Sequence, residues 1–187
     1  MKISFYRCIA AAFVAVSLVA SSGALAEVDL AKSSITAISR QMNVPVEGVF
    51  KKFSARISFD PAKPDAGSAQ LTVDVGSYDL GDASYNSQVA GKEWFDAKTY
   101  PNATFVSSSI AAVGGNRYRV NGTLTIKGKS ETVAVPVTLT QRENMQTLDG
   151  MLSIKRSQFG IGTGEWKDTA IVADDVALKF HIVAAKF

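Results

Sequence analysis

Few residues of this sequence are of a type that could do chemistry. Four carboxylates, at Asp79, Asp82, Glu93 and Asp96, lie close together along the chain. Paired carboxylates act as acid and base in glycoside hydrolysis and bind Ca²⁺. These four lack the spacing of an EF-hand loop, and no neighbouring motif orients them. Exposed loop carboxylates are usually solvated, so we expect no catalytic or metal-binding role for them.

The sequence contains one histidine, His181, and one cysteine, Cys8. A Ser-His-Asp triad could use only His181, and a histidine-rich metal site is excluded. His181 falls beside Lys179 on the polar side of an alternating segment, which indicates a solvated surface side chain. The sequence therefore predicts a protein that is not an enzyme, with no catalytic residues, no metal and no cofactor.

Two glycine-containing segments only partly match phosphate-binding loops. The Gly-Ile-Gly-Thr-Gly run at 160–164 is followed by a turn and another strand, whereas a phosphate loop opens a helix. The run Gly128-Lys129-Ser130 ends like a Walker A motif, but Thr123 stands where the first glycine should be. We interpret 160–164 as a flexible connection between strands and the second match as coincidental.

Residues 1–26 have the three regions of a secretory signal peptide. Lys2 and Arg7 form a positive start, an apolar run extends from Cys8 to Ala20, and an A-x-A pattern ends at Ala26. The apolar run is shorter than the roughly 20 residues of a spanning helix. We expect cleavage after Ala26, a periplasmic protein with one domain over residues 27–187, and no stable membrane span after cleavage.

Cleavage would change the charge and the thiol content. The full sequence carries 20 Lys and Arg against 17 Asp and Glu, a formal charge of +3. Because Lys2 and Arg7 precede the cleavage point and no acidic residue does, the charge would fall to +1. That charge is too weak for binding to a nucleic acid through counterion release. Loss of Cys8 would leave no thiol for a disulfide or a redox site.

From residue 27 onward, apolar and polar residues alternate as in strands with one buried face. Such segments, separated by glycine-containing and proline-containing turns, predict an antiparallel sandwich or barrel. We interpret 118–126 as one strand with Gly122 at a bulge or bend, or where another group approaches the backbone. Residues 77–100 lack alternation, so we expect a long excursion with a short helix or two, of the kind that forms a lid or a binding loop.

Three segments carry a resemblance to a known family. They are 48–60, which begins Gly-Val-Phe-Lys-Lys-Phe; 94–105, which contains Trp-Phe-Asp, Tyr-Pro and Thr-Phe; and 118–128. In order and spacing the chain resembles the YceI-like polyisoprenoid-binding family, and Arg156 to Ile161 also fits. The resemblance implies an all-β, lipocalin-like antiparallel barrel of about eight strands, located in the periplasm, whose apolar interior takes a long isoprenoid chain.

One position departs from the family pattern. Many members have an Arg-Asp-x-His-Leu type segment before the Phe-Phe-Asp marker, and here Gln88 stands in the place of the histidine. If that segment orients a head group in some members, this protein orients it differently or binds a less charged ligand.

The function we predict is a carrier or scavenger of an isoprenoid-type amphiphile, polyprenyl or quinone-like, without catalysis. A homodimer is an open alternative to a single chain.

We expect small residues at Ala55, Ala69, Gly122 and Ala134 to leave room in the wall, and Tyr85 and Gln88 to lie in the loop over the ligand. A barrel of this size can instead be filled by side chains, which would make the protein a secreted stress-response or interaction module without a ligand. The expected lining residues, each of which could also be plain core, are Phe50, Phe53, Phe59, Trp94, Phe95, Phe105, Leu124, Phe159 and Phe180.

Overall fold

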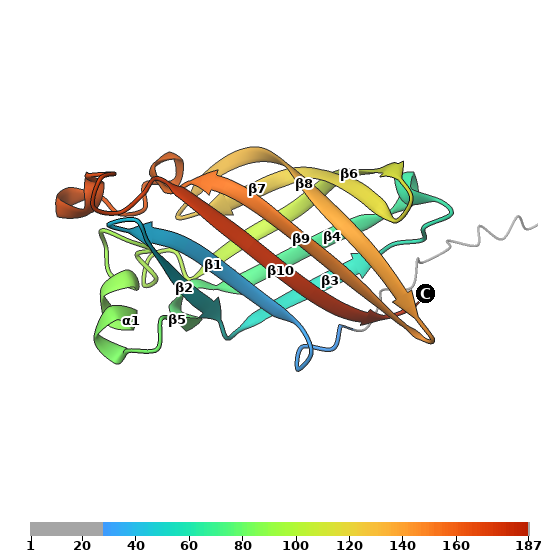
Figure 1. Cartoon of the computed structure of the whole chain (residues 1–187), viewed down its shortest axis with the longest axis horizontal. Coiled ribbons are helices and arrows are strands. Elements are labelled where there is room, and N and C mark those ends of the chain that lie inside the picture. Colours follow the sequence, from blue (N-terminus) through green and yellow to red (C-terminus); the bar gives the residue numbers. More distant parts are fainter. Residues whose placement is uncertain (1–27, 187) are drawn as a thin grey trace, which may run out of the picture.

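The computed structural model describes residues 28–186, so the predicted signal peptide at 1–26 lies outside the described residues. Within this range one curved antiparallel sheet contains ten strands, in the order β3-β4-β6-β7-β8-β9-β10-β1-β2-β5 (Figure 1). The predicted all-β, lipocalin-like architecture is confirmed. The strand number is ten and not about eight, partly because β5 has only two residues, too few for alternation to reveal.

The ten strands of the sheet have the following bounds. They are β1 (Ser34–Gln41), β2 (Val44–Phe50), β3 (Phe53–Ser58), β4 (Ser68–Asp74), β5 (Tyr78–Asp79), β6 (Asn102–Gly114), β7 (Arg117–Ile126), β8 (Lys129–Arg142), β9 (Met145–Lys155) and β10 (Asp175–Ala185).

Short helical segments occupy several of the connections. The α-helix of the described range is α1 (Ala83–Val89), and it lies in the predicted excursion between 77 and 100. The remaining helical turns are the 3₁₀ helices η1 (Pro64–Ala66), η2 (Val75–Ser77), η3 (Arg156–Phe159) and η4 (Gly164–Lys167).

Alternation determines which face of each strand is buried. In β7, Tyr118, Val120, Leu124 and Ile126 are buried, and their neighbours Arg119 and Thr123 are exposed. In β8 the buried positions are Val135, Val137 and Leu139. Because successive side chains of a strand point to opposite faces, each of these strands contributes one apolar row to the interior.

Gly122 lies inside β7, as the sequence predicts for one strand over 118–126. Its partner on β6 is Ser107, and the register then shifts so that Ser109 faces Asn121. A Cβ atom at Gly122 would lie 2.5 Å from the Val106 carbonyl oxygen and 2.6 Å from the ring of Phe105. Glycine is therefore required here by the close approach of β6, whose bulge bends the wall.

The two ends of the sheet order, β3 and β5, are joined by loop contacts. In the described part of the chain no strand pairing links β3 to β2 or β5. Where β2 turns into β3, the Lys51 amide donates to the Ser77 carbonyl at 3.1 Å, and the Lys52 amide donates to the Ser77 hydroxyl at 3.0 Å. These bonds draw the edges of the curved sheet together.

Candidate functional site: an apolar cavity inside the barrel

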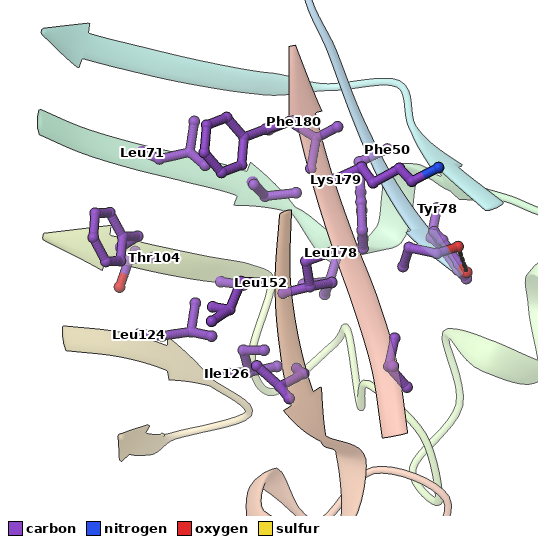
Figure 2. Close-up of a pocket in the computed structure, with 18 of the residues that line it drawn as sticks. Phe50, Leu71, Tyr78, Thr104, Leu124, Ile126, Leu152, Leu178, Lys179 and Phe180 are labelled. Carbon is purple, nitrogen blue, oxygen red and sulfur yellow. Dashed lines mark hydrogen bonds between the residues drawn. The ribbon is translucent and has the colours of Figure 1, made fainter. Parts of the chain in front are cut away.

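The curved sheet encloses a cavity of about 470 Å³. Its wall is made almost entirely of apolar side chains from β1 to β10, with α1 and the segment around η4 at one end. In Figure 2, Leu71 of β4, Leu124 of β7, Leu152 of β9 and Leu178 of β10 surround the same space. The interior is therefore hollow over part of its length.

Three aromatic rings form one side of the cavity. Phe50 ends β2, Tyr78 begins β5, and Phe95 follows α1; the ring centroids are 4.7 Å apart for Phe50 and Tyr78, 6.0 Å for Phe50 and Phe95, and 5.7 Å for Tyr78 and Phe95. The tilted and edge-on arrangements are those that aromatic pairs prefer. Burial, with a smaller effect of Glu47, raises the pKa of Tyr78 to about 12. Its hydroxyl stays protonated and donates to the Ala37 carbonyl at 3.3 Å.

The helix α1 lies at one end of the cavity and carries residues that line it. The Asp82 carboxylate accepts from the Ser84 and Tyr85 amides at 2.8 and 3.2 Å, which caps the first turn. From this helix Tyr85, Gln88 and Val89 line the cavity, Val89 buried and the other two exposed. The predicted excursion thus contributes to the cavity wall at this end.

Two tryptophans meet near α1. Trp94 and Trp166 both line the cavity, with ring centroids 5.6 Å apart. The indole Nε1 of Trp94 is buried, and among the described residues it has no hydrogen-bond acceptor. Flat aromatic surfaces thus line this part of the cavity.

Arg156 organises the segment that carries Trp166. Its side chain is 3% exposed, and its guanidinium donates to five main-chain carbonyls at 2.7 to 3.1 Å. Burial lowers the pKa of Arg156, and Coulombic attraction to Asp174 opposes that change. Because the carbonyls come from Ile161, Gly162, Trp166, Val172 and Ala173, the connection predicted to be flexible is held by one side chain.

The structure brings most of the predicted lining residues together. The residues from the predicted set that line the cavity are Phe50, Phe59, Trp94, Phe95, Phe105, Leu124 and Phe180, joined by Tyr85 and Gln88. Sequence reasoning missed Tyr78, Trp166 and Arg156. Tyr78 lies in the two-residue strand β5 and Trp166 in the 3₁₀ turn η4, and hydrophobic alternation reveals neither.

Two predicted residues are outside the cavity wall. Phe159, in η3, is 1% exposed and packs against Ile154 and Ile161 in a second core cluster, and it does not itself line the cavity. Phe53 is the first residue of the edge strand β3 and packs, half-buried, against the main core. Their assignment as lining residues is therefore corrected.

Of the four small residues expected to leave room in the wall, two line the cavity and two do not. Ala55 and Ala69 line the cavity, and Gly122 is buried at the β6 contact without lining it. Ala134 is exposed on the outer face, since it alternates with Val133 and Val135. The prediction that Ala134 leaves room inside is wrong.

The loop carboxylates have structural partners. The Asp79 carboxylate accepts from the Asn86 side chain and the Gly81 amide, both at 2.9 Å, and these bonds lower its pKa, with Lys51 adding to the effect. Asp82 caps α1, as described above. Among residues 28–186, no three His, Cys, Asp or Glu side chains are grouped so that they could hold a metal ion.

His181 is exposed, as predicted, and lies outside the barrel. Its Nδ1 is 2.6 Å from an Asp149 carboxylate oxygen on the neighbouring strand. Over the described range, no helix has both the length and the apolar character needed to cross a membrane.

The curved antiparallel sheet around an apolar cavity defines a barrel of the lipocalin-like class, which holds apolar molecules or packs its interior with side chains. A model of the YceI-like domain matches residues 27–184. The chain therefore belongs to the YceI-like family, and the predicted family is confirmed.

Solved structures and curated proteins resemble the chain to different extents. BcnA of Burkholderia cenocepacia is 69% identical with a TM-score of 0.83, over 84% of this chain and 99% of that one. The Campylobacter jejuni YCEI protein is 26% identical with a TM-score of 0.70, over 76% of this chain and 85% of that one.

A polyisoprenoid-binding domain from Saccharophagus degradans is 20% identical with a TM-score of 0.72, over 87% of this chain and 98% of that one, and shows that the fold is shared. A UPF0312 protein of Pseudomonas putida is 32% identical over 50% of this chain and 48% of its own length. The chain thus spans about half the length of the curated relatives it matches.

Proposed function

We propose that this protein is a periplasmic carrier or scavenger that holds an isoprenoid-type amphiphile, polyprenyl or quinone-like, in its barrel without catalysis. The observation that carries the proposal is the apolar cavity of about 470 Å³, a volume within the roughly 300–1,000 Å³ range of small-molecule sites. A polyprenyl tail needs only such an apolar tube. The solved domain from Saccharophagus degradans, described as polyisoprenoid-binding, supports the same ligand class.

Burial of the lipid tail supplies the main favourable free energy of binding. Removal of about 400 Å² of lipid surface from water, at about 25 cal/mol per Å², gives roughly 10 kcal/mol before the costs of ordering. The side-chain-filled alternative would require a closed interior, and the volume between Leu71, Leu124 and Leu178 favours a ligand instead.

The residues at the α1 end suit a head group of low charge. Gln88 and Tyr85 are neutral, and both line the cavity there. The five donors of Arg156 are occupied by carbonyl groups, so the guanidinium has none left for a phosphate. We therefore place an uncharged, acceptor-bearing head group beside Gln88 and Tyr85.

Native mass spectrometry and lipid extraction of protein purified from its own host test the proposal. We expect a bound lipid with isoprene repeats, and uptake of farnesol after delipidation. An empty protein that also fails to bind farnesol would contradict the proposal. N-terminal sequencing of the protein from a periplasmic fraction tests export, with Glu27 as the expected first residue.

A further inference from the structure

Three large apolar side chains at the α1 end of the barrel are exposed although nothing in the fold covers them. Met42, in the turn between β1 and β2, is 69% exposed, Val44 at the start of β2 is 63% exposed, and Ile171, before β10, is 42% exposed. We call these three residues the mouth patch. None of the three lines the cavity, so retention of a ligand does not explain them.

The mouth patch is continuous with the cavity. Gln41 and Val172 form a β-bridge, and both line the cavity. Their chain neighbours, Met42 and Ile171, are joined by a hydrogen bond of 2.8 Å from the Met42 amide to the Ile171 carbonyl. Gln41 and Val172 thus line the cavity, and the residues next to them in the chain, Met42 and Ile171, lie on the outside.

The backbone at Met42 is unusual for its residue type. Met42 and Asn43 have φ of +47° and +64°, a turn in which Asn and Gly are the preferred residues. A methionine in the left-handed region is disfavoured unless it serves another purpose. Its side chain is mostly exposed, so core packing does not compensate for the conformation.

The mouth patch lies at the end of the barrel where the cavity opens. Figure 1 shows α1, the β1–β2 hairpin and the segment that carries η4 at the same end of the barrel. Of the residues that line the cavity, Gln41, Tyr85 and Gln88 are exposed to solvent there. At the opposite end, Phe59 and Tyr118 pack edge to face with ring centroids 4.8 Å apart.

Charges near the patch balance. Arg40, two positions before Met42, and Asp168, whose carbonyl accepts from the Ile171 amide, are both exposed and carry opposite charges. A surface that attracts this end must therefore do so through burial of apolar side chains and not through net charge. Apolar side chains that enter the boundary between head groups and acyl chains bind membranes in this way.

We infer that the mouth patch docks on the surface of a phospholipid bilayer, so that the cavity opens toward the lipid phase with which it exchanges its ligand. The inference rests on the proposed function for its purpose, but the contact itself can be tested without a ligand. Docking lets an isoprenoid pass between cavity and bilayer with little exposure to water.

The test compares two matched sets of substitutions. Met42→Ser, Val44→Thr and Ile171→Thr together remove the patch, whereas Val106→Thr, Val113→Thr and Met151→Ser remove three similarly exposed side chains from the outer wall. Superimposable urea unfolding curves for the variants and the unsubstituted protein establish that both sets fold.

The first measurement is flotation of the ligand-free, signal-cleaved protein with phosphatidylcholine vesicles. We expect the unsubstituted protein and the wall variant to float, binding to persist in 0.5 M NaCl, and the bound fraction of the patch variant to fall at least threefold. The inference would be overturned if the unsubstituted protein did not float, if its binding were lost in 0.5 M NaCl, or if the patch variant floated as well as the unsubstituted protein.

The second measurement separates this inference from the proposed function. Protein loaded with NBD-labelled farnesol transfers it to phosphatidylcholine vesicles, and docking predicts a rate that rises with vesicle concentration and falls at least threefold in the patch variant. A rate independent of vesicle concentration counts against docking. If farnesol does not bind in vesicle-free buffer, the proposed function fails, and flotation still decides the docking surface.

Discussion

The Nη2 atom of Arg156 donates a hydrogen bond of 2.7 Å to the main-chain oxygen of Val172, sixteen positions further along the chain. The same side chain bonds to the carbonyls of Ile161, Gly162 and Trp166. One buried cation thus orders the connection between β9 and β10, which positions Trp166 and Val172 in the cavity wall.

Substitution of Arg156 by methionine should destabilise the protein. The change leaves five carbonyls without their donor in a mostly buried site, so the free energy of unfolding should fall by about 2–4 kcal/mol. Urea titration followed by tryptophan fluorescence measures it. Arg119→Met, on the exposed face of β7, is the control and should change the stability by less than about 0.5 kcal/mol. Equal effects of the two substitutions would show that Arg156 does not hold the connection.

The contrast between Arg156 and β7 shows what the sequence could and could not predict. Alternation gave the buried rows of β7 and β8, and Gly122 indicated the bulge. Alternation is a local property, whereas the partners of Arg156 are carbonyls between 161 and 173, whose orientation depends on the folded loop. The glycines at 160, 162 and 164 were the available signal, since all three have positive φ. Gly162 also lies against the guanidinium.

The lining residues show the same limit. Phe105 and Leu124 lie in strands, where alternation points them inward, and both line the cavity as predicted. Phe159 and Trp166 lie in 3₁₀ turns, where no period relates sequence position to direction, and the sequence placed the first inside and missed the second. Ala134 is a different case, since the alternation of β8 already points it outward.

Enlargement of Ala69 should block the cavity. Ala69→Phe introduces a ring where the alanine lines the interior, and the volume it removes should weaken binding of N-phenyl-1-naphthylamine at least tenfold, about 1.4 kcal/mol. Fluorescence titration measures the affinity. Ala134→Phe places the same ring on the outer face of β8 and should bind the probe as the unsubstituted protein does. Full affinity in Ala69→Phe would mean that the probe binds elsewhere.

Asp82 should act through the helix it caps and not through chemistry. Asp82→Ala removes the acceptor of the Ser84 and Tyr85 amides, so the stability should fall by about 1 kcal/mol. Because α1 carries Tyr85 and Gln88, probe affinity should also decrease. Asp82→Asn retains a capping oxygen and should restore both properties to within a few tenths of a kcal/mol. If asparagine behaves like alanine, the charge of Asp82 matters and the capping explanation is wrong.

Tyr78 should make the stability depend on alkaline pH. Its pKa is about 12 in the folded protein and about 10 in an unfolded chain. Between these values the unfolded chain loses the proton first, so the contribution of Tyr78 is complete below about pH 10 and is lost as the pH rises to about 12. The loss should be about 2 kcal/mol at most, allowing for partial exposure.

The measurement is urea unfolding of the unsubstituted protein and of Tyr78→Phe at several pH values from about 9 to about 11.5. Phenylalanine retains the ring beside Phe50 and Phe95 but loses the bond to the Ala37 carbonyl, so the variant starts less stable by about 1 kcal/mol. Its stability should then fall less steeply with pH, because it has no phenol to ionise at position 78, and the two curves should converge. Parallel curves would show that the Tyr78 hydroxyl titrates alike in the folded and unfolded chains, which would contradict the pKa raised by its burial.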